Sequence, residues 1–432
     1  MDSRTRGPKT RPGRPQLDPK QLARFAGLPL LLALLLSACA QVAPHSANVP
    51  AQITDAGNNA IPGVTAARLT PAHWIARVQD PASVVLDTAA IATRNARLLA
   101  QDGSVIDLPN VPDPAAQKDV RAHIESLSAP PQRALFDATG AAVTAAEIAA
   151  LRDALALDAI AAPVPLRFGL VTRRSDLRSF PTTRRVFSRA GDTDIDRFQE
   201  SALFPGTPVA VLHASRDGQW WFVASKLYTA WIEARNVAIG ERGAVFDYAS
   251  RSPYLIVTGA QVRTVFTPEA PQVSDLLLDM GVRLPLLADW PDSRPVNGQL
   301  GYASHVVALP VRGPDGALQI QPALVPRSAD VGTGYLPLTR ANLINQAFKF
   351  LGERYGWGHS YGTRDCSGFV SEVYRSFGVE MPRNTRDQGV SPAFDRIEFT
   401  ADDDHDHRVA VLRTLDVGDL HSESTVRMRW ML

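Results

Sequence analysis

The strongest constraint on the fold is a change of hydrophobic pattern along the chain. Between about residues 164 and 334, short β-rich runs are separated by turn residues, and Asp217-Gly218 and Asp315-Gly316 each lie between two apolar runs. Because glycine tolerates a positive φ, an Asp-Gly pair in this setting is a strong hairpin signal. The spacing predicts two successive small β-barrels, residues 164–245 and 246–334.

Helical patterns flank this β-rich region on both sides. Residues 67–163 show mostly helical periodicity with polar N-cap candidates, which predicts an α-rich domain. Apolar residues return to helical spacing from Thr339 to Gly352, and a second amphipathic helix is predicted to begin at Cys366. A chain of 432 residues has room for roughly two to four domains. We therefore predict a multidomain α+β protein.

The N-terminal residues have the pattern of an export leader. Several Arg and Lys residues precede the apolar run 25–39, which is shorter than the roughly 20 residues of a membrane span. The run ends in Leu36-Ser37-Ala38-Cys39, which resembles a bacterial lipobox, and a plain signal peptide is the alternative. We predict an exported, periplasmic protein anchored to a membrane through lipid on Cys39. Ala40 favours the outer membrane, and residues 40–66 are predicted to form a flexible tether.

The net charge excludes nucleic acid as an expected partner, and the cysteine count singles out one thiol. The formal net charge of +1 provides no field that would attract nucleic acid, so none is predicted as a partner. The chain has two cysteines, and lipidation of Cys39 would leave Cys366 alone in an oxidising compartment. A helix N-terminus stabilises a thiolate, and the preceding glycine-rich loop would let a substrate backbone approach. On this local pattern alone, a nucleophile and a buried structural cysteine remain equally open.

Three sequence blocks around Cys366 resemble the NlpC/P60 cysteine peptidases. The blocks are YGWG, DCSG and MPR, and they occur in the family's order and spacing. This family comprises papain-like α+β enzymes that cut peptidoglycan stem peptides. The resemblance implies that Cys366 is the nucleophile and that Tyr355, Asp365, Ser367 and Thr385 contact the substrate. The alternatives are a packed aromatic, a solvated Asp, a capping Ser and a polar turn. No cofactor or metal and a monomer are expected.

The resemblance extends over most of the chain. The β-rich region is similar to two bacterial SH3 modules of multidomain NlpC/P60 lysins, and the helical block is similar to their N-terminal stabilising domain. The first SH3 module usually closes one end of the cleft, so Tyr228 is a further candidate contact. The predicted parts are a lipoprotein signal peptide (1–39), a tether (40–66), a helical stabilising domain (67–163), SH3-like modules 1 (164–245) and 2 (246–334), and the peptidase domain (335–432).

The C-terminal residues depart from the family pattern. A cysteine peptidase needs an imidazole to take the thiol proton and return it to the leaving amine. In the family this histidine follows a Gly-Asp-Leu block within a Gly-His-Val segment. The block is present at 418–420, but no Gly-His-Val follows, and we predict no strand after residue 420. His421 is the candidate base, although it is several residues early. An incomplete, truncated and poorly stable peptidase domain is therefore expected.

The predicted function is hydrolysis of peptidoglycan stem peptides. The target bond expected from the resemblance is the one between γ-D-glutamate and the diamino acid, in peptidoglycan or muropeptides. Two alternatives remain open: a non-catalytic cell-wall-binding lipoprotein that acts through its SH3 modules, and an acyltransferase with the same Cys-His chemistry. One departure bears on the site itself, because His359 replaces the second glycine after Trp357 and is expected to crowd the loop.

Overall fold

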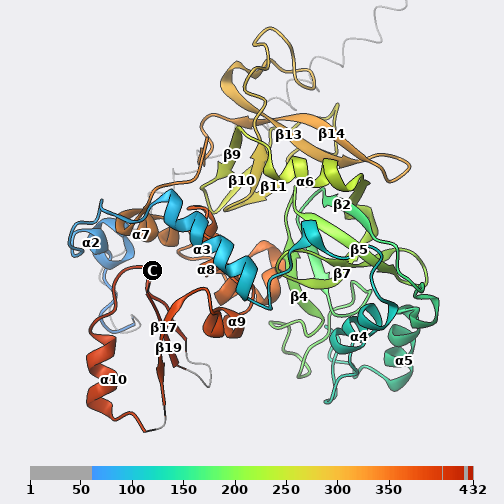
Figure 1. Ribbon diagram of the computed structural model, residues 1–432, viewed down its shortest axis with the longest axis horizontal. Coiled ribbons are helices and arrows are strands. Elements are labelled where there is room, and N and C mark those ends of the chain that lie inside the picture. Colours follow the sequence, from blue (N-terminus) through green and yellow to red (C-terminus); the bar gives the residue numbers. More distant parts are fainter. Residues whose placement is uncertain (1–60, 401, 423–426, 432) are drawn as a thin grey trace, which may run out of the picture. The chain divides into compact units, whose positions relative to one another are not determined.

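The computed structural model describes residues 61–400, 402–422 and 427–431 (Figure 1). Cys39 and the predicted leader lie outside these residues, as does most of the tether. None of the helices described is both long and apolar enough to cross a membrane. Residues 61–66 belong to a separate unit and form a turn in which the Val64 amide donates to the Ile61 carbonyl. All contacts given below lie within residues 67–432, which cluster as one unit.

Between residue 67 and the β-rich region, where the sequence predicts helices, the structure has four α-helices. The helices are α2 (Pro71–Ile75), α3 (Thr88–Gln101), α4 (Gln117–Leu127) and α5 (Ala145–Ala154). Helix α3 begins where the Asp87 carboxylate accepts a hydrogen bond from Ala90 N–H, and α5 begins at a capping box of Thr144 and Glu147. Helix α3 packs its apolar face against the C-terminal part of the chain, whereas α4 and α5 pack against the first β module.

The first β module is one antiparallel sheet of seven strands. Its order is β4-β3-β7-β6-β5-β2-β8. The strands are β2 (Arg167–Val171), β3 (Ser175–Arg178), β4 (Gln199–Leu203), β5 (Pro208–Ala214), β6 (Trp220–Ala224), β7 (Thr229–Glu233) and β8 (Val237–Gly240). Gly218 has a φ of 69° in the turn between β5 and β6, so the predicted hairpin is confirmed. Strand β6 is buried along its whole length because Trp220 and Phe222 enter one core and Trp221 and Val223 enter another.

The second β module follows helix α6 (Arg242–Ser250) and consists of three small sheets. Its strands are β9 (Tyr254–Val257), β10 (Gln261–Arg263), β11 (Leu277–Asp279), β12 (Arg283–Pro285), β13 (Ser304–Arg312), β14 (Leu318–Pro326) and β15 (Val331–Gly332). Strands β13 and β14 form a long hairpin (Figure 1). It turns through Gly316 with a φ of 86°, which confirms the second hairpin prediction.

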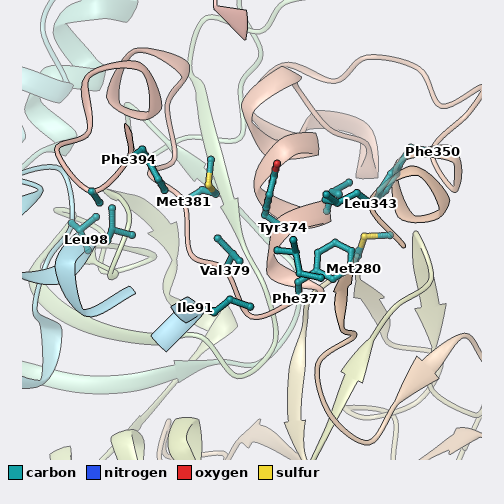
Figure 2. Close-up of a cluster of buried hydrophobic side chains, with 14 residues drawn as sticks. Ile91, Leu98, Met280, Leu343, Phe350, Tyr374, Phe377, Val379, Met381 and Phe394 are labelled. Atoms are coloured by element: carbon teal, nitrogen blue, oxygen red, sulfur yellow. The ribbon is translucent and has the colours of Figure 1, made fainter. Parts of the chain in front are cut away.

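The C-terminal part surrounds the predicted nucleophile with helices. Strand β16 (Leu338–Thr339) pairs with β1 (Val84–Leu86), and then come α7 (Arg340–Phe348), α8 (Cys366–Arg375) and α9 (Thr385–Val390). The Thr339 hydroxyl accepts from Asn342 N–H and caps α7, as predicted. The shared hydrophobic core joins α3, α7, α8 and the chain after α8 (Figure 2). It includes Ile91, Leu98, Met280, Leu343, Phe350, Tyr374, Phe377, Val379, Met381 and Phe394.

The prediction that no strand follows residue 420 is wrong. Strand β17 (Asp395–Phe399) pairs antiparallel with β19 (Arg427–Met431), and β18 (His421–Ser422) pairs with the other edge of β19. The sequence RMRWM alternates basic and apolar residues with a period of two, which suits a strand. A search for Gly-His-Val overlooks that alternation. Before β18, Asp404 accepts a hydrogen bond from His407 N–H and caps helix α10 (His405–Leu412).

Candidate active site

Cys366 is the first residue of helix α8, and its side chain is exposed. The Asp365 carboxylate caps the helix by accepting from Gly368 N–H at 2.7 Å. The thiol opens onto a groove of about 450 Å³, which we call the Cys366 groove. Its lining includes Phe350, Tyr355, Asp365 and Phe369. An exposed thiol at a helix start, beside a groove, is placed to attack a bound carbonyl. This location matches the nucleophile interpretation and not the buried-core one.

Two predicted substrate residues lie next to the thiol. The Thr385 hydroxyl is 3.4 Å from Cys366 Sγ, at the start of α9. Tyr355, on the loop before α8, lines the same groove as Cys366. Burial, together with Cys366 and Asp365, raises the pKa of Tyr355 to about 12, so its phenol stays protonated and able to donate. Both side chains are exposed at the surface of the site. The structure thus brings these two residues and the nucleophile together.

Asp365, which lines the groove beside Cys366, forms a buried ion pair with Arg383. The Arg383 guanidinium holds both carboxylate oxygens, at 2.7 and 3.2 Å, and also donates to Ser367 Oγ at 2.9 Å. Gly358 N–H donates to the same carboxylate at 3.0 Å. Burial acts to raise the pKa of Asp365, but Arg383 outweighs it and holds that pKa below its ordinary value. Asp365 is therefore an anion committed to the helix cap and to Arg383.

His359 fills a buried space behind this pair. Arg383 Nη2 donates to His359 Nδ1 at 2.9 Å, and His359 Nε2 lies 3.0 Å from Glu372 Oε1. Since the guanidinium can only donate, Nδ1 is the acceptor and Nε2 carries the proton. Burial, and then Arg383, hold the pKa of His359 well below its ordinary value, so the ring is neutral. The expected crowding is relieved at Gly368, where a Cβ would lie 2.5 Å from His359 Cε1.

The buried network continues into the second β module. Glu372 Oε2 accepts from Arg364 Nε at 2.5 Å, and Arg364 Nη2 donates to Asp279 Oδ1 at 2.9 Å. Arg174 from the first module also pairs with Asp279, at 3.0 Å. Alternating charges of this kind satisfy one another where water is excluded. The start of α8 is thus connected through named contacts to both β modules.

The first β module holds the glycine loop in place. Gln199 Nε2 donates to the Gly358 carbonyl at 2.8 Å, and Trp357 Nε1 donates to the Gln199 carbonyl at 3.0 Å. Ser201 Oγ accepts from Arg383 Nε at 2.6 Å. The next residue along β4, Glu200, accepts from the Tyr228 hydroxyl at 2.6 Å, and burial raises the pKa of the Glu200 carboxyl. Sequence reasoning singled out Tyr228 but missed Glu200, Arg383 and Gln199.

No histidine hydrogen-bonds to Cys366 among the side chains that the structure describes. The side chain of His421, the candidate base, lies outside that part, although its backbone belongs to β18. His407 lies on α10, with Nε2 3.7 Å from Asp403 Oδ1. The search of the described residues also finds no group of three or more His, Cys, Asp or Glu side chains that could hold a metal ion. The base assignment stays a prediction.

Comparison with known families identifies the two functional parts. The sequence model of the NlpC/P60 family matches residues 352–422, the segment that contains Cys366 and its neighbours. The chain thus carries an NlpC/P60 domain, typical of a family of cysteine peptidases, in this segment. A second model, the SH3 domain of the SH3b1 type, matches residues 185–233 of the first β module. The protein is thus a mixed α+β multidomain chain with an SH3b domain and an NlpC/P60 domain.

Two relatives extend the comparison beyond these segments. A gamma-D-glutamyl-L-lysine dipeptidyl-peptidase of Bacillus cereus (strain ATCC 10987 / NRS 248) is 27% identical over 237 residues, which cover 52% of this chain and 64% of that protein. The chain thus spans somewhat less than two thirds of that relative. A solved NlpC/P60 endopeptidase from Photobacterium damselae subsp. piscicida aligns with a TM-score of 0.58 and 18% identity, over 73% of this chain and 68% of that one. The second likeness concerns the fold alone.

Proposed function

We propose that this NlpC/P60 protein is a peptidoglycan stem-peptide endopeptidase that cleaves the bond between γ-D-glutamate and the diamino acid. The observation that carries the proposal is the Cys366 thiol, exposed at the start of α8 in a groove and contacted by Thr385 and Tyr355. The name of the Bacillus cereus relative, which specifies a γ-D-glutamyl-L-lysine bond, supports the same bond class. The two domains matched imply peptidoglycan as the substrate.

The reaction divides the roles among the residues of the Cys366 groove. Cys366 Sγ attacks the scissile carbonyl carbon while its proton passes to an imidazole, for which we propose His421. That proton then goes to the leaving amine, and water hydrolyses the thioester to release the acid and the thiol. Tyr355 and Thr385 are the direct substrate contacts because they are exposed beside the thiol. Asp365 and Ser367 act mainly through Arg383, since both are buried against it.

The remaining parts of the proposal concern architecture and location. We assign the segments to the boundaries given above, with residues 246–334 as a second SH3-like module. A protein that acts on the cell wall must be exported. We further propose a monomer with lipid on Cys39 and a place at the outer membrane. Incorporation of labelled palmitate that is lost in Cys39→Ser would support the anchor, and unchanged labelling would refute it.

A muropeptide digestion assay tests the proposed activity. The full chain should release L-Ala-γ-D-Glu from stem peptides, and Cys366→Ala should lower the rate by at least about ten-thousandfold. His421→Ala should cause a loss of similar order, whereas His405→Ala, a matched control on α10, should leave the rate unchanged. Retained pull-down by sacculi without any release from the unmodified chain would refute the enzyme and favour a binding lipoprotein. Cleavage that persists in Cys366→Ala would refute the nucleophile.

A further inference from the structure

A second cavity lies on the other side of helix α8 from the nucleophile. It has a volume of about 390 Å³, which is within the usual range for small-ligand sites. Residues 368, 371 and 375 of α8 line it at three- and four-residue steps, whereas Cys366 and Phe369 line the Cys366 groove. The two linings have no residue in common. We call this space the Arg375 cavity, and we propose that it binds a small molecule through its carboxylate.

The charges around the Arg375 cavity favour an anion. Four cationic side chains and one carboxylate line it, and His359 in its wall is neutral. The cations are Lys226, Arg283, Arg375 and Arg383, and the carboxylate is Glu380. Three of the cations are already bonded: Lys226 to Glu380, Arg283 to backbone carbonyls of α6 and the residue after it, and Arg383 to Asp365. The lining therefore keeps an excess of positive charge.

Arg375 and Tyr335 are the two polar side chains of this lining that form no hydrogen bond or ion pair within the described part of the chain. The guanidinium carbon of Arg375 lies 5.5 Å from the centre of the Phe204 ring. Arg375 is partly buried, and burial lowers its pKa although the carboxylates of Glu372 and Glu380 act to raise it. A partly buried guanidinium that forms no hydrogen bond within the described part of the chain loses part of its hydration without a replacement. An anion in the cavity would supply the missing acceptor.

Two glycines make room for these two side chains. A Cβ on Gly281, which has a φ of 78°, would lie 2.7 to 2.8 Å from the stem of Arg375. A Cβ on Gly378, with a φ of 83°, would lie 2.9 Å from the ring of Tyr335. Neither position could carry a side chain without displacing its neighbour. The unpartnered guanidinium and phenol therefore rest on surfaces shaped to fit them.

The chemistry of the lining specifies the class of ligand. A guanidinium presents a planar fork of N–H donors that matches a carboxylate, and a phenol can add one more donor. The rest of the wall includes apolar side chains that suit an aliphatic body; they are Leu203, Phe204, Leu227, Val282, Val379 and Met381. A small carboxylic acid or short peptide meets both requirements. The choice of a cell-wall dipeptide as a probe rests on the proposed function, whereas the proposed carboxylate site does not depend on that function.

Calorimetric titration tests this site in the full chain carrying Cys366→Ala, which prevents turnover. We expect L-Ala-γ-D-Glu or acetate to bind, and Arg375→Met to weaken that binding by about tenfold to a hundredfold. Tyr335→Phe, which removes only a hydroxyl, should weaken it by about threefold to tenfold. Arg263→Met is the matched control, because Arg263 is exposed and paired with Asp275 away from the cavity. It should leave the affinity unchanged.

Each other outcome has a distinct meaning. Equal affinity in the parent, Arg375→Met and Tyr335→Phe would overturn the proposal, and Tyr335→Phe decides alone if Arg375→Met does not fold. Binding of acetate without the dipeptide would identify simple carboxylates as the ligands. Saturation by inorganic phosphate with no response to either carboxylate would refute the ligand class. Arg375-dependent binding, together with an unmodified chain that releases no product in the muropeptide digestion assay, would keep this site and reject the proposed function.

Discussion

Replacement of His359 tests both the backbone and the buried network of the site. His359 has a φ of 64°, a left-handed conformation that favours glycine. Its ring bonds to Arg383 and Glu372, which are both charged and buried. A hydrogen bond to a charged group contributes about 1.5 to 3 kcal/mol, so loss of both bonds removes about 3 to 6 kcal/mol. This left-handed conformation costs a residue with a Cβ about 1 to 2 kcal/mol, and a glycine at the same position avoids that cost.

These magnitudes predict that the glycine variant at position 359 is more stable than the alanine variant, although glycine is usually the more destabilising of the two. His359→Gly should lower the free energy of unfolding by about 1 to 5 kcal/mol, because it loses both hydrogen bonds but avoids the backbone cost. His359→Ala should lose about 1 to 2 kcal/mol more, since it loses the same bonds and keeps the strained φ. His359→Asn should lie closest to the parent. Asparagine tolerates this conformation, and its amide oxygen can accept from Arg383.

Urea unfolding followed by circular dichroism measures this order. The alkylation rate of Cys366 in the native state reports whether the helix start keeps its geometry. A His359→Ala protein at least as stable as His359→Gly would refute the backbone argument. A His359→Gly protein as stable as the parent would refute the contribution of the two hydrogen bonds.

Four further predictions concern the same region. The pKa of His359 in the fold is held below its ordinary value of 6.5, so the unfolded chain takes up the imidazole proton at a higher pH than the folded chain does. The free energy of unfolding should therefore fall as the pH drops below about 6.5. The fall should be smaller in His359→Asn, which has no imidazole. Asp365→Asn should lower the free energy of unfolding by about 3 to 5 kcal/mol near neutral pH, because it leaves the buried Arg383 guanidinium without its carboxylate. Since the pKa of Asp365 is lowered in the fold, the difference in unfolding free energy between this variant and the parent should shrink in acid. Thr385→Val should slow muropeptide hydrolysis by about tenfold or less and leave the urea midpoint unchanged, because Thr385 is exposed and contacts Cys366. Gly368→Ala should destabilise the fold, and the added loss should be smaller in a His359→Gly background, where the ring that the Cβ would strike is absent.

Features that depend on neighbouring residues could be predicted from the sequence. The start of α8 at Cys366 follows from an apolar period, and both hairpins follow from Asp-Gly turns, whereas the Asp365 cap of α8 was not predicted. The substrate candidates Tyr355 and Thr385 lie beside the thiol where the family blocks placed them. Their roles in binding stay predictions.

Features that depend on distant segments could not be predicted in this way. Arg383 reads in the sequence as part of a Pro-Arg block, and nothing local shows that it holds Asp365, His359 and Ser201 together. The alternation in β19 suits a strand, but its pairing with β17 brings together two segments that no local pattern connects. Arg375 is likewise one more basic residue at a helix end until the fold places it beside a cavity. Each of these depends on contacts between segments far apart in the chain.

The arrangement of strand β4 argues against treating the SH3b domain as a separate wall-binding appendage. Gln199 and Ser201 alternate with Glu200 along this strand, and all three make contacts that bear on the site. Gln199 fixes the backbone of the glycine loop, and Ser201 fixes the arginine that anchors the helix cap. A loop with left-handed residues at 358, 359 and 361 would not hold one conformation by local preference. The first β module therefore supplies part of the structure that positions Cys366.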